Sequence, residues 1–167
     1  MGQDINEFDR WRYTPLQTAA QTRNEEIAKF LIESGADIHK ASGTDLQPLH
    51  HACLQNSIEC VQMLVDRGAH VNDIRNLMTP LVCAIIADGE EIIRLLISRG
   101  ADVNYNIRGA ATPLLVAMYR LHRGIGIIPR PNLRPVDRLR MRIVQTLIDA
   151  GADRRLLRVL GRNSNLD

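Results

Sequence analysis

Two short motifs recur along the chain, the first of them at steps of 33, 32 and 33 residues, and this period constrains the fold more than any other feature. A Pro-Leu pair occurs four times, in Thr14-Pro15-Leu16, Gln47-Pro48-Leu49, Thr79-Pro80-Leu81 and Thr112-Pro113-Leu114. A Gly-Ala pair follows 21 residues after the start of the first three motifs, at Gly35, Gly68 and Gly100. In the fourth copy the interval to Gly151 is 39 residues, which indicates an insertion of 18 residues. Such periodicity predicts stacked repeats, each packing only against its neighbours.

Each repeat contains the signals of two short helices. In the first repeat, Thr14 is suited to the N-cap of a helix and Pro15 to its first turn. A polar break then precedes a second apolar stretch, in which we expect Ile27, Phe30, Leu31 and Ile32 to form the buried face. Gly35 ends that helix, because glycine adopts the left-handed cap without strain. Residues 1–8 are expected to be a frayed lead-in.

The fourth copy departs from this pattern after His122. Glycine and proline are frequent between residues 123 and 135, which opposes a continuous helix there. We therefore predict an insertion over 123–140, with the second helix resuming near 136–141. Apolar residues over about 154–162 predict a short amphipathic helix that covers the end of the stack.

The net charge of +2 hides an asymmetry along the chain. Residues 1–119 hold 10 Lys and Arg against 15 Asp and Glu, whereas residues 120–162 hold 11 arginines against 3 aspartates. No apolar run approaches the ~20 residues that span a membrane, and the polar N-terminus is not that of a signal peptide. Cys53, Cys60 and Cys83 form no paired motif, which favours reduced thiols and a cytoplasmic location, with the nucleus as an alternative.

The repeated motifs resemble those of the ankyrin repeat family over about residues 9–153. The most similar segments are Pro48-Leu49-His50 with Ala52, and Leu95-Leu96-Ile97 followed by Gly100-Ala101-Asp102-Val103-Asn104. The resemblance implies an all-α solenoid of antiparallel helix pairs with short β-hairpin fingers. It implies a single domain over 1–167, with repeats at about 9–41, 42–73, 74–106 and 107–153.

Two departures from the family pattern have local consequences. Gln47 replaces the capping threonine in the second repeat. The histidine of the Pro-Leu-His motif is present only as His50, because Gln17, Val82 and Leu115 stand at its other positions. We therefore expect the hydrogen bonds that brace the hairpins to be lost in three repeats.

The resemblance implies a protein-binding module, acting as an adaptor or a competitive inhibitor, that binds its partner through the concave face. Carried over position by position, this face contains Arg10, Trp11, Tyr13, Gln21, Thr22, Thr44, Leu46, Leu54, Gln55, Asn76, Met78, Ile86, Arg108, Tyr119 and Arg120. Trp11 and Tyr13 are the strongest candidates, since Trp, Tyr and Arg dominate interface hot spots. The alternatives are that Trp11 covers the N-terminal end of the stack and that Leu46, Met78 and Ile86 are ordinary scattered surface residues.

A second hypothesis concerns the basic insertion. Its arginines are Arg123, Arg130, Arg134, Arg138, Arg140 and Arg142. They could bind an acidic protein, nucleic acid or an anionic membrane surface, or pair with the acidic body of a neighbouring copy. The absence of Phe, Trp and Tyr after Tyr119 disfavours base stacking. The alternative is a solvated basic loop.

The sequence shows no pattern typical of catalysis. His50 and His51 are adjacent and point about 100° apart on a helix, so they do not converge on one metal ion. The carboxylates Asp88, Glu90 and Glu91 are expected in a solvated turn between helices. There is no phosphate loop and no nucleophile elbow. We expect no catalytic site, no metal site, no cofactor and no small-molecule substrate.

Overall fold

The computed structural model describes residues 4–106, 111–125 and 135–155, without the side chains of 123–125. The chain forms two compact units, Met1–Ala101 and Asp102–Asp167, and each is described by itself. No helix in the described ranges is long and apolar enough to cross a membrane.

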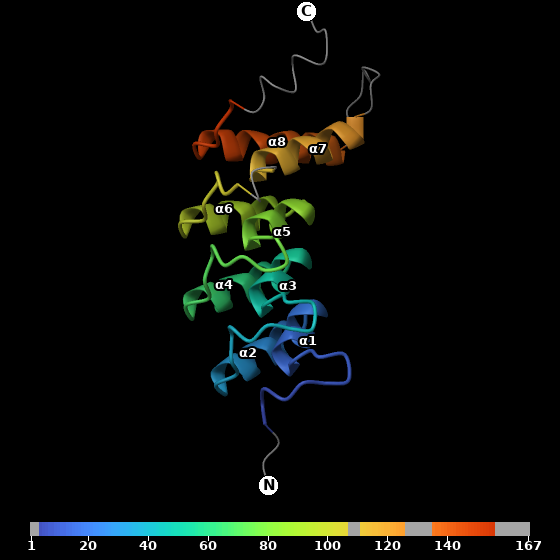
Figure 1. The fold of residues 1–167 in the computed structure, drawn as a ribbon, viewed down its shortest axis with the longest axis vertical. Coiled ribbons are helices and arrows are strands. Elements are labelled where there is room, and N and C mark those ends of the chain that lie inside the picture. The colour runs from blue at the N-terminus through green and yellow to red at the C-terminus, as the bar shows by residue number, and fades with distance from the viewer. Residues whose placement is uncertain (1–3, 107–110, 126–134, 156–167) are drawn as a thin grey trace, which may run out of the picture. The chain divides into compact units, whose positions relative to one another are not determined.

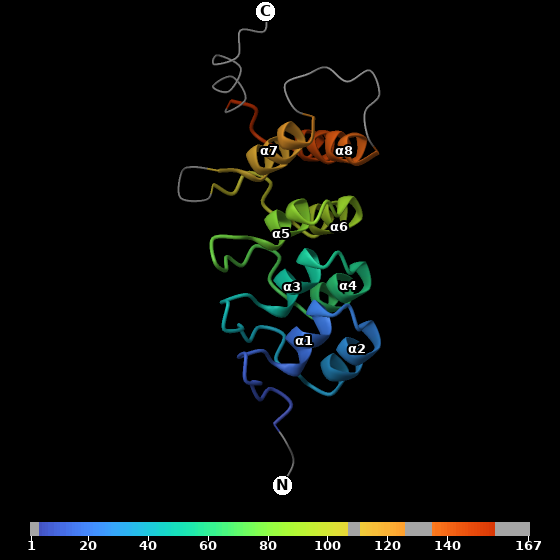
Figure 2. The same ribbon diagram turned by 90° about the vertical axis from the view of Figure 1, so that its right-hand side faces the viewer.

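The first unit consists of three helix pairs, as the repeats predicted. Its helices are α1 (Pro15–Gln21), α2 (Glu25–Glu33), α3 (Pro48–Leu54), α4 (Ile58–Asp66), α5 (Pro80–Ile86) and α6 (Glu90–Ser98). The inner helices α1, α3 and α5 form one row, and the outer helices α2, α4 and α6 form a second row (Figure 1). The loops that lead to each inner helix, here called fingers, project beside the inner row (Figure 2). An isolated antiparallel bridge joins Arg75 and Met78 in the third finger.

The core of this unit lies between the two rows of helices. Its most buried large side chains, each less than 2% exposed, are Leu16, Leu49, Leu64, Leu81, Ile85, Ile92, Ile93, Leu96 and His50. Small residues such as Ala52 and Ala84 are also fully buried, which lets the helices lie close together. The predicted apolar face of α2 is only half right: Leu31 and Ile32 are buried, but Ile27 is 50% exposed and Phe30 is 67% exposed.

The inner helices begin with threonine caps, with one exception. The Thr14 side chain accepts a hydrogen bond from the Gln17 amide, and Thr79 accepts one from Val82, both at 3.3 Å. Gln47 occupies the same position before α3 and makes no capping hydrogen bond through its side chain. The predicted loss of this cap is therefore confirmed.

Gln47→Thr is expected to raise the free energy of unfolding by about 1 kcal/mol, because a threonine side chain can accept from the exposed amides of the first turn. The reciprocal variant Thr79→Gln should lower it by a similar amount. Urea titration of both variants against the parent chain measures the two changes. No gain from Gln47→Thr, together with a loss from Thr79→Gln, would show that the second repeat cannot use the cap.

The expected loss of the bracing hydrogen bond is wrong for the first repeat, where Gln17 stands in place of the histidine. His50 hydrogen-bonds through Nε2 to the Asp73 carbonyl oxygen at 3.2 Å, and thereby holds the finger that follows α4. In the preceding repeat, Gln17 Nε2 donates to the Lys40 carbonyl oxygen, which stands at the equivalent position. Gln17 also accepts from the Thr14 amide at 2.8 Å and completes a capping box. An amide side chain therefore braces the first repeat in place of imidazole.

The expected frayed lead-in is also wrong from residue 4 onward. Asn6 Oδ1 accepts a hydrogen bond from the Asp37 amide at 2.8 Å, and the Lys40 ammonium donates to the Asn6 carbonyl oxygen at 2.9 Å. Asn72 makes a similar link between later repeats, donating to the Gly100 carbonyl oxygen at 2.9 Å. The N-terminal segment therefore attaches to the first repeat as the end of one repeat attaches to the next.

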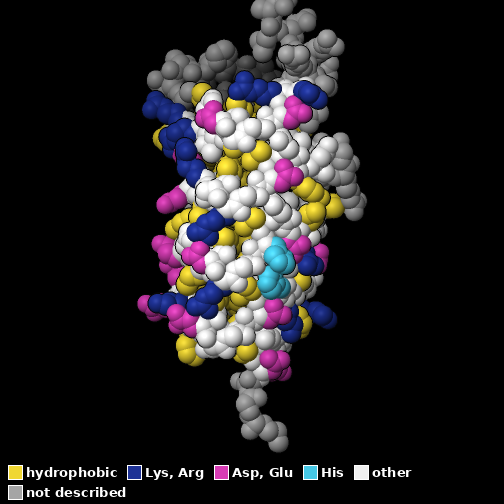
Figure 3. Space-filling model, turned by 90° about the vertical axis from the view of Figure 1, so that its left-hand side faces the viewer, with side chains coloured by type: hydrophobic (Ala, Val, Ile, Leu, Met, Phe, Trp, Pro, Cys, Tyr) yellow, Lys and Arg dark blue, Asp and Glu magenta, His cyan; other side chains and the backbone are white. Residues whose placement is uncertain are grey.

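The junction between the first and second repeats lacks the asparagine found at the other junctions described. His39 stands at the position of Asn6 and Asn72, and its ring lies against the ring of His70 with a centroid distance of 4.7 Å. Figure 3 shows histidine side chains together on one face of the molecule. Ring contact thus takes the place of the side-chain to backbone hydrogen bond between the first two repeats.

The second unit contains one longer helix pair, α7 (Pro113–Ile125) and α8 (Pro135–Asp149), which pack against each other. α7 has 13 residues against 7 in α1, and α8 has 15 against 9 in α2. α7 runs three residues past the expected break at His122, to Ile125, and α8 begins at Pro135, next to the expected resumption near 136–141, so both ends of the predicted insertion are helical. The inserted residues therefore lengthen both helices, and 126–134 lie outside the described residues.

Other features of this unit are those of the earlier repeats. Thr112 accepts from the Leu115 amide at 3.4 Å, and Gly151 has a φ of 91°, close to the 85° of Gly35. Asn104 donates to the Gly151 carbonyl oxygen at 3.0 Å and accepts from the Asp153 amide at 2.7 Å. Most of the predicted capping helix at 154–162 lies outside the described residues.

Candidate functional site

The exposed side of the inner helices presents one side chain per repeat at the same position. These residues are Gln21 in α1, Leu54 in α3 and Ile86 in α5, here called the inner strip. Gln21 is exposed, whereas Leu54 and Ile86 are half-buried. Because α1 packs on α3 and α3 on α5, the three side chains follow one another along a single face. Thr22 and Gln55 are the C-cap residues that follow α1 and α3, the first exposed and the second half-buried.

The first finger carries the two aromatic residues that the sequence favoured. Trp11 is 61% exposed, and the Arg10 guanidinium lies 3.8 Å from the centre of its ring. Such exposure does not fit the alternative in which Trp11 covers the end of the stack. Tyr13 is half-buried and meets the ring of His51 edge-on, with 5.5 Å between centroids. The His51 side chain of α3 therefore helps to position Tyr13, while the guanidinium on Trp11 comes from the same finger.

Leu46 is not a surface residue, which corrects its assignment to the binding face. It is 6% exposed, because the second finger turns back on itself through a hydrogen bond from the Ser42 amide to the Leu46 carbonyl oxygen at 2.8 Å. The neighbouring candidates Thr44 and Asn76 are exposed, and Met78 is half-buried. The second finger therefore offers polar atoms at its tip and keeps its large apolar side chain inside.

A link between the second and third fingers was missed in the sequence. The Arg75 guanidinium lies 3.6 Å from one Asp45 oxygen, and the Asn76 amide donates to the other at 3.3 Å. Arg75 also pairs with Asp73 at 3.1 Å. Exposed ion pairs contribute little to stability, but this one restricts two adjacent finger tips. Opposite charges at the tips of successive fingers, here Asp45 and Arg75, are the sequence signal that could have predicted this ion pair.

The remaining candidates belong to the second unit. Tyr119 is 62% exposed on α7, and Arg120 is half-buried. Arg138 and Arg142 are exposed on α8, whereas Arg140 is half-buried and donates to the Arg120 carbonyl oxygen at 3.1 Å. Arg140 thus joins α8 to α7. Arg108, Arg130 and Arg134 lie outside the described residues, as does the side chain of Arg123.

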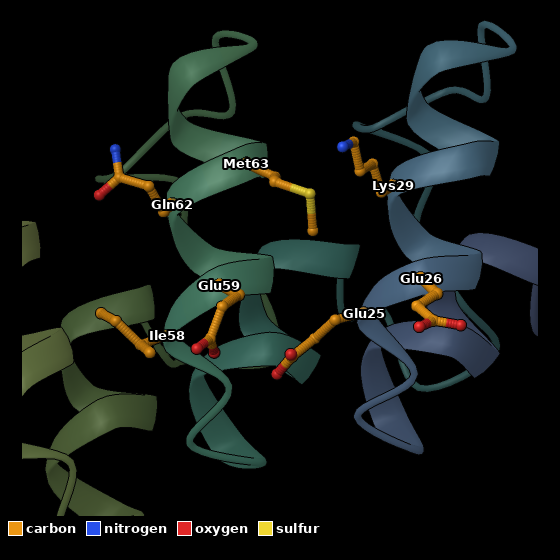
Figure 4. Close-up of a pocket in the computed structure, with 7 residues that line it drawn as sticks. All are labelled: Glu25, Glu26, Lys29, Ile58, Glu59, Gln62 and Met63. Carbon is orange, nitrogen blue, oxygen red and sulfur yellow. The ribbon is translucent and has the colours of Figure 1, made fainter.

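The outer row of helices carries an open groove of about 630 Å³ between α2 and α4. Its lining residues are Glu25, Glu26, Lys29, Ile58, Glu59, Gln62 and Met63. Figure 4 shows Glu25 of α2 and Met63 of α4 projecting into the space between the two helices. Glu25 accepts a hydrogen bond from the Ser57 hydroxyl at 3.0 Å, which ties α2 to the start of α4. None of the predicted binding residues lines this groove.

The described residues offer little reactive chemistry. They contain no cluster of three or more His, Cys, Asp and Glu side chains suited to a metal ion. All three cysteines are buried and free, and burial raises the pKa of Cys83 to about 12, so its thiol stays protonated at neutral pH. Burial also lowers the pKa of His51, to about 4, with a smaller effect from His50. Both side chains are buried, His51 in α3 and Cys83 in α5.

Known relatives match this chain over its repeats. A family model described as "Ankyrin repeats (3 copies)" matches residues 39–107, and one described as "Ankyrin repeat" matches residues 11–42. The Nuclear factor NF-kappa-B p105 subunit of Rattus norvegicus is 33% identical over 75 residues, which is 43% of this chain and 8% of that protein.

Two further relatives also match about half of this chain. The Putative ankyrin repeat protein FPV230 of Fowlpox virus is 34% identical over 77 residues, covering 46% of this chain and 41% of that protein. The Ankyrin repeat, SAM and basic leucine zipper domain-containing protein 1 of Mus musculus is 33% identical over 89 residues. The match covers 50% of this chain and 18% of that protein. The chain thus spans less than half the length of these relatives. With the family models covering residues 11–107 and three stacked helix pairs in that region, the chain belongs to the ankyrin repeat family.

Proposed function

We propose that this chain is a non-catalytic adaptor or competitive inhibitor that binds a partner protein along its inner helices and fingers. Ankyrin repeats are generally protein–protein interaction modules, and the proposal concerns which surface this chain uses. The observation that carries it is the inner strip, where Gln21, Leu54 and Ile86 remain accessible at one position in three successive repeats. A partner could therefore contact several repeats at once.

The chemistry of this surface suits a protein. Trp11 supplies a large exposed ring with a guanidinium stacked on it, and Tyr13 is held from below by His51. Aromatic side chains of this kind carry much of the energy of protein interfaces at a small entropic cost. The half-buried Leu54 and Ile86 add apolar area beside them. A cytoplasmic location is part of the proposal, because the three free buried thiols suit a reducing compartment.

The test is affinity capture from the native source followed by titration of the captured protein. Trp11→Ala with Tyr13→Ala is expected to weaken binding at least about tenfold, as loss of an interface hot spot does. Lys29→Ala with Gln62→Ala, on the outer groove, is the matched control and should bind as the parent does. Full affinity in the first double variant would refute the assignment of the surface.

A second candidate function rests on the exposed Arg138 and Arg142 of α8, in a part of the chain rich in arginine. Their surface suits an acidic protein, nucleic acid or an anionic membrane. Retention on heparin that is lost with Arg138→Ser and Arg142→Ser would favour this function. Retention on heparin should be unchanged by Trp11→Ala with Tyr13→Ala.

A further inference from the structure

The N-terminal end of the first unit contains an apolar groove, and of its lining residues only Tyr13 and Thr22 belong to the binding surface assigned above. It has a volume of about 890 Å³ and lies between the N-terminal segment and helices α1 and α2. Its apolar lining comes from Ile5, Phe8, Pro15, Ile27, Phe30 and Leu31. Ile27 and Phe30 are 50% and 67% exposed, although α2 has apolar residues at the positions that face the core elsewhere. Apolar area gathered in this way marks an interaction site more often than scattered apolar residues do.

Comparison between repeats shows why this groove is open. Cys60 in α4 and Ile92 in α6 occupy the same repeat position as Ile27, and both are fully buried. α2 packs on α4 and α4 packs on α6, so each of these residues is covered by the preceding outer helix. In the described part of the chain no outer helix precedes α2. Ile27 and Phe30 therefore form a surface suited to contact with a helix.

The charge of the groove restricts what can occupy it. The charged side chains that line it are Asp4, Glu7 and Asp9, with no lysine, arginine or histidine among the lining residues. The Lys40 ammonium lies 4.3 Å from the centre of the Phe8 ring but does not line the groove. An occupant should therefore combine apolar side chains with positive charge and carry few carboxylates.

The chain itself contains such a segment. Residues 154–162 read Arg-Arg-Leu-Leu-Arg-Val-Leu-Gly-Arg, with four arginines, four large apolar residues and no acid. Residues 156–162 lie outside the described residues, so the argument rests on their sequence. We propose that the groove binds residues 154–162 of a second copy of this chain, with the leucines against Ile27 and Phe30 and the arginines beside Asp4, Glu7 and Asp9. Such a contact joins two different surfaces, so copies would associate head to tail.

This association uses a groove that shares Tyr13 and Thr22 with the partner surface proposed above, so analytical ultracentrifugation of the full chain without any partner tests it. The average mass is expected to rise with protein concentration at about 50 mM salt and to fall at about 500 mM, where the ion pairs are screened. Phe30→Glu should keep the chain monomeric. Leu77→Glu is the matched control, because Leu77 is an exposed apolar residue of the third finger, outside the groove, and this variant should associate as the parent does.

A mixing experiment identifies the occupant. Leu157→Asp with Leu160→Asp should also give monomers, whereas an equimolar mixture of this variant and Phe30→Glu should form dimers, because one copy supplies an intact groove and the other an intact tail. A circular dichroism melt of each variant checks that the fold is retained; Phe30 is mostly exposed, so its replacement should not unfold α2.

Several results would overturn the proposal. They are a parent chain that stays monomeric at about 100 μM and low salt, an unchanged association in Phe30→Glu, or a mixture that remains monomeric. A fluorescent synthetic peptide of residues 154–162 serves as the probe for other occupants. If it binds the parent but not Phe30→Glu while the parent remains monomeric, the groove accepts an apolar-basic segment but the second copy is excluded as its source.

Discussion

Ile92→Ala is expected to lower the free energy of unfolding by about 3 kcal/mol, as other truncations of fully buried isoleucine do. The Ile92 side chain is 0% exposed in α6, since α4 covers it, and the surrounding helices cannot close the cavity without moving. Urea denaturation, followed by circular dichroism, measures the change. The whole transition should be analysed, because repeats unfold as coupled neighbours rather than strictly together.

Ile27→Ala is the matched control for this prediction. Ile27 has the same residue type and the same repeat position, but it is 50% exposed because no outer helix precedes α2 in the described residues. Its truncation should cost less than about 1 kcal/mol. Equal losses for the two variants would mean that burial by the preceding helix is not what stabilises these positions, and the stacked arrangement would be in doubt.

Acidification from pH 7.5 to pH 5 is expected to lower the free energy of unfolding by about 2 kcal/mol through His51 alone. Burial lowers its pKa from the ordinary 6.5 to about 4 in the folded chain. The unfolded chain therefore binds a proton at a higher pH than the folded chain does. Stability is greatest above pH 6.5 and falls as the pH drops toward 4. Burial also lowers the pKa of His50, which adds to the effect in the same direction.

Urea titrations at pH 7.5, 6 and 5 measure this dependence. His51→Val should make stability less dependent on pH, and valine is a reasonable replacement because Val116 stands at the equivalent position of α7. The remaining dependence would come from His50 and from carboxylates. A His51→Val variant as sensitive to acid as the parent would contradict the assignment.

The helix pairs could be predicted from the sequence because their signals are local. Threonine caps, proline at the first turn and glycine at the last lie within a few residues of the helix ends they determine. The exposure of Ile27 and Phe30 could not be predicted in this way. Their spacing is that of a buried face, and they are exposed because no outer helix precedes α2 in the described residues.

Another error arose where a different residue type makes the same hydrogen bond. Gln17 is not the family's histidine, yet its amide reaches the finger that histidine reaches in the next repeat. Asp4-Ile5-Asn6 resembles Asp102-Val103-Asn104, and this likeness could have identified the ordered N-terminal segment.

Leu46 was wrongly assigned to the surface because an irregular finger has no helical or strand periodicity. Without such periodicity, the sequence does not indicate which of its side chains face the core. The pairing of Asp45 with Arg75 depends on how two fingers lie beside each other.

Site-specific photo-crosslinking to the captured partner tests the proposed binding surface most directly. A benzophenone amino acid in place of Leu54, on the inner strip, is compared with the same amino acid in place of Gln62, on the outer groove. We predict a crosslink to the partner from position 54 and almost none from position 62. A crosslink from position 62 with none from position 54 would contradict binding along the inner helices.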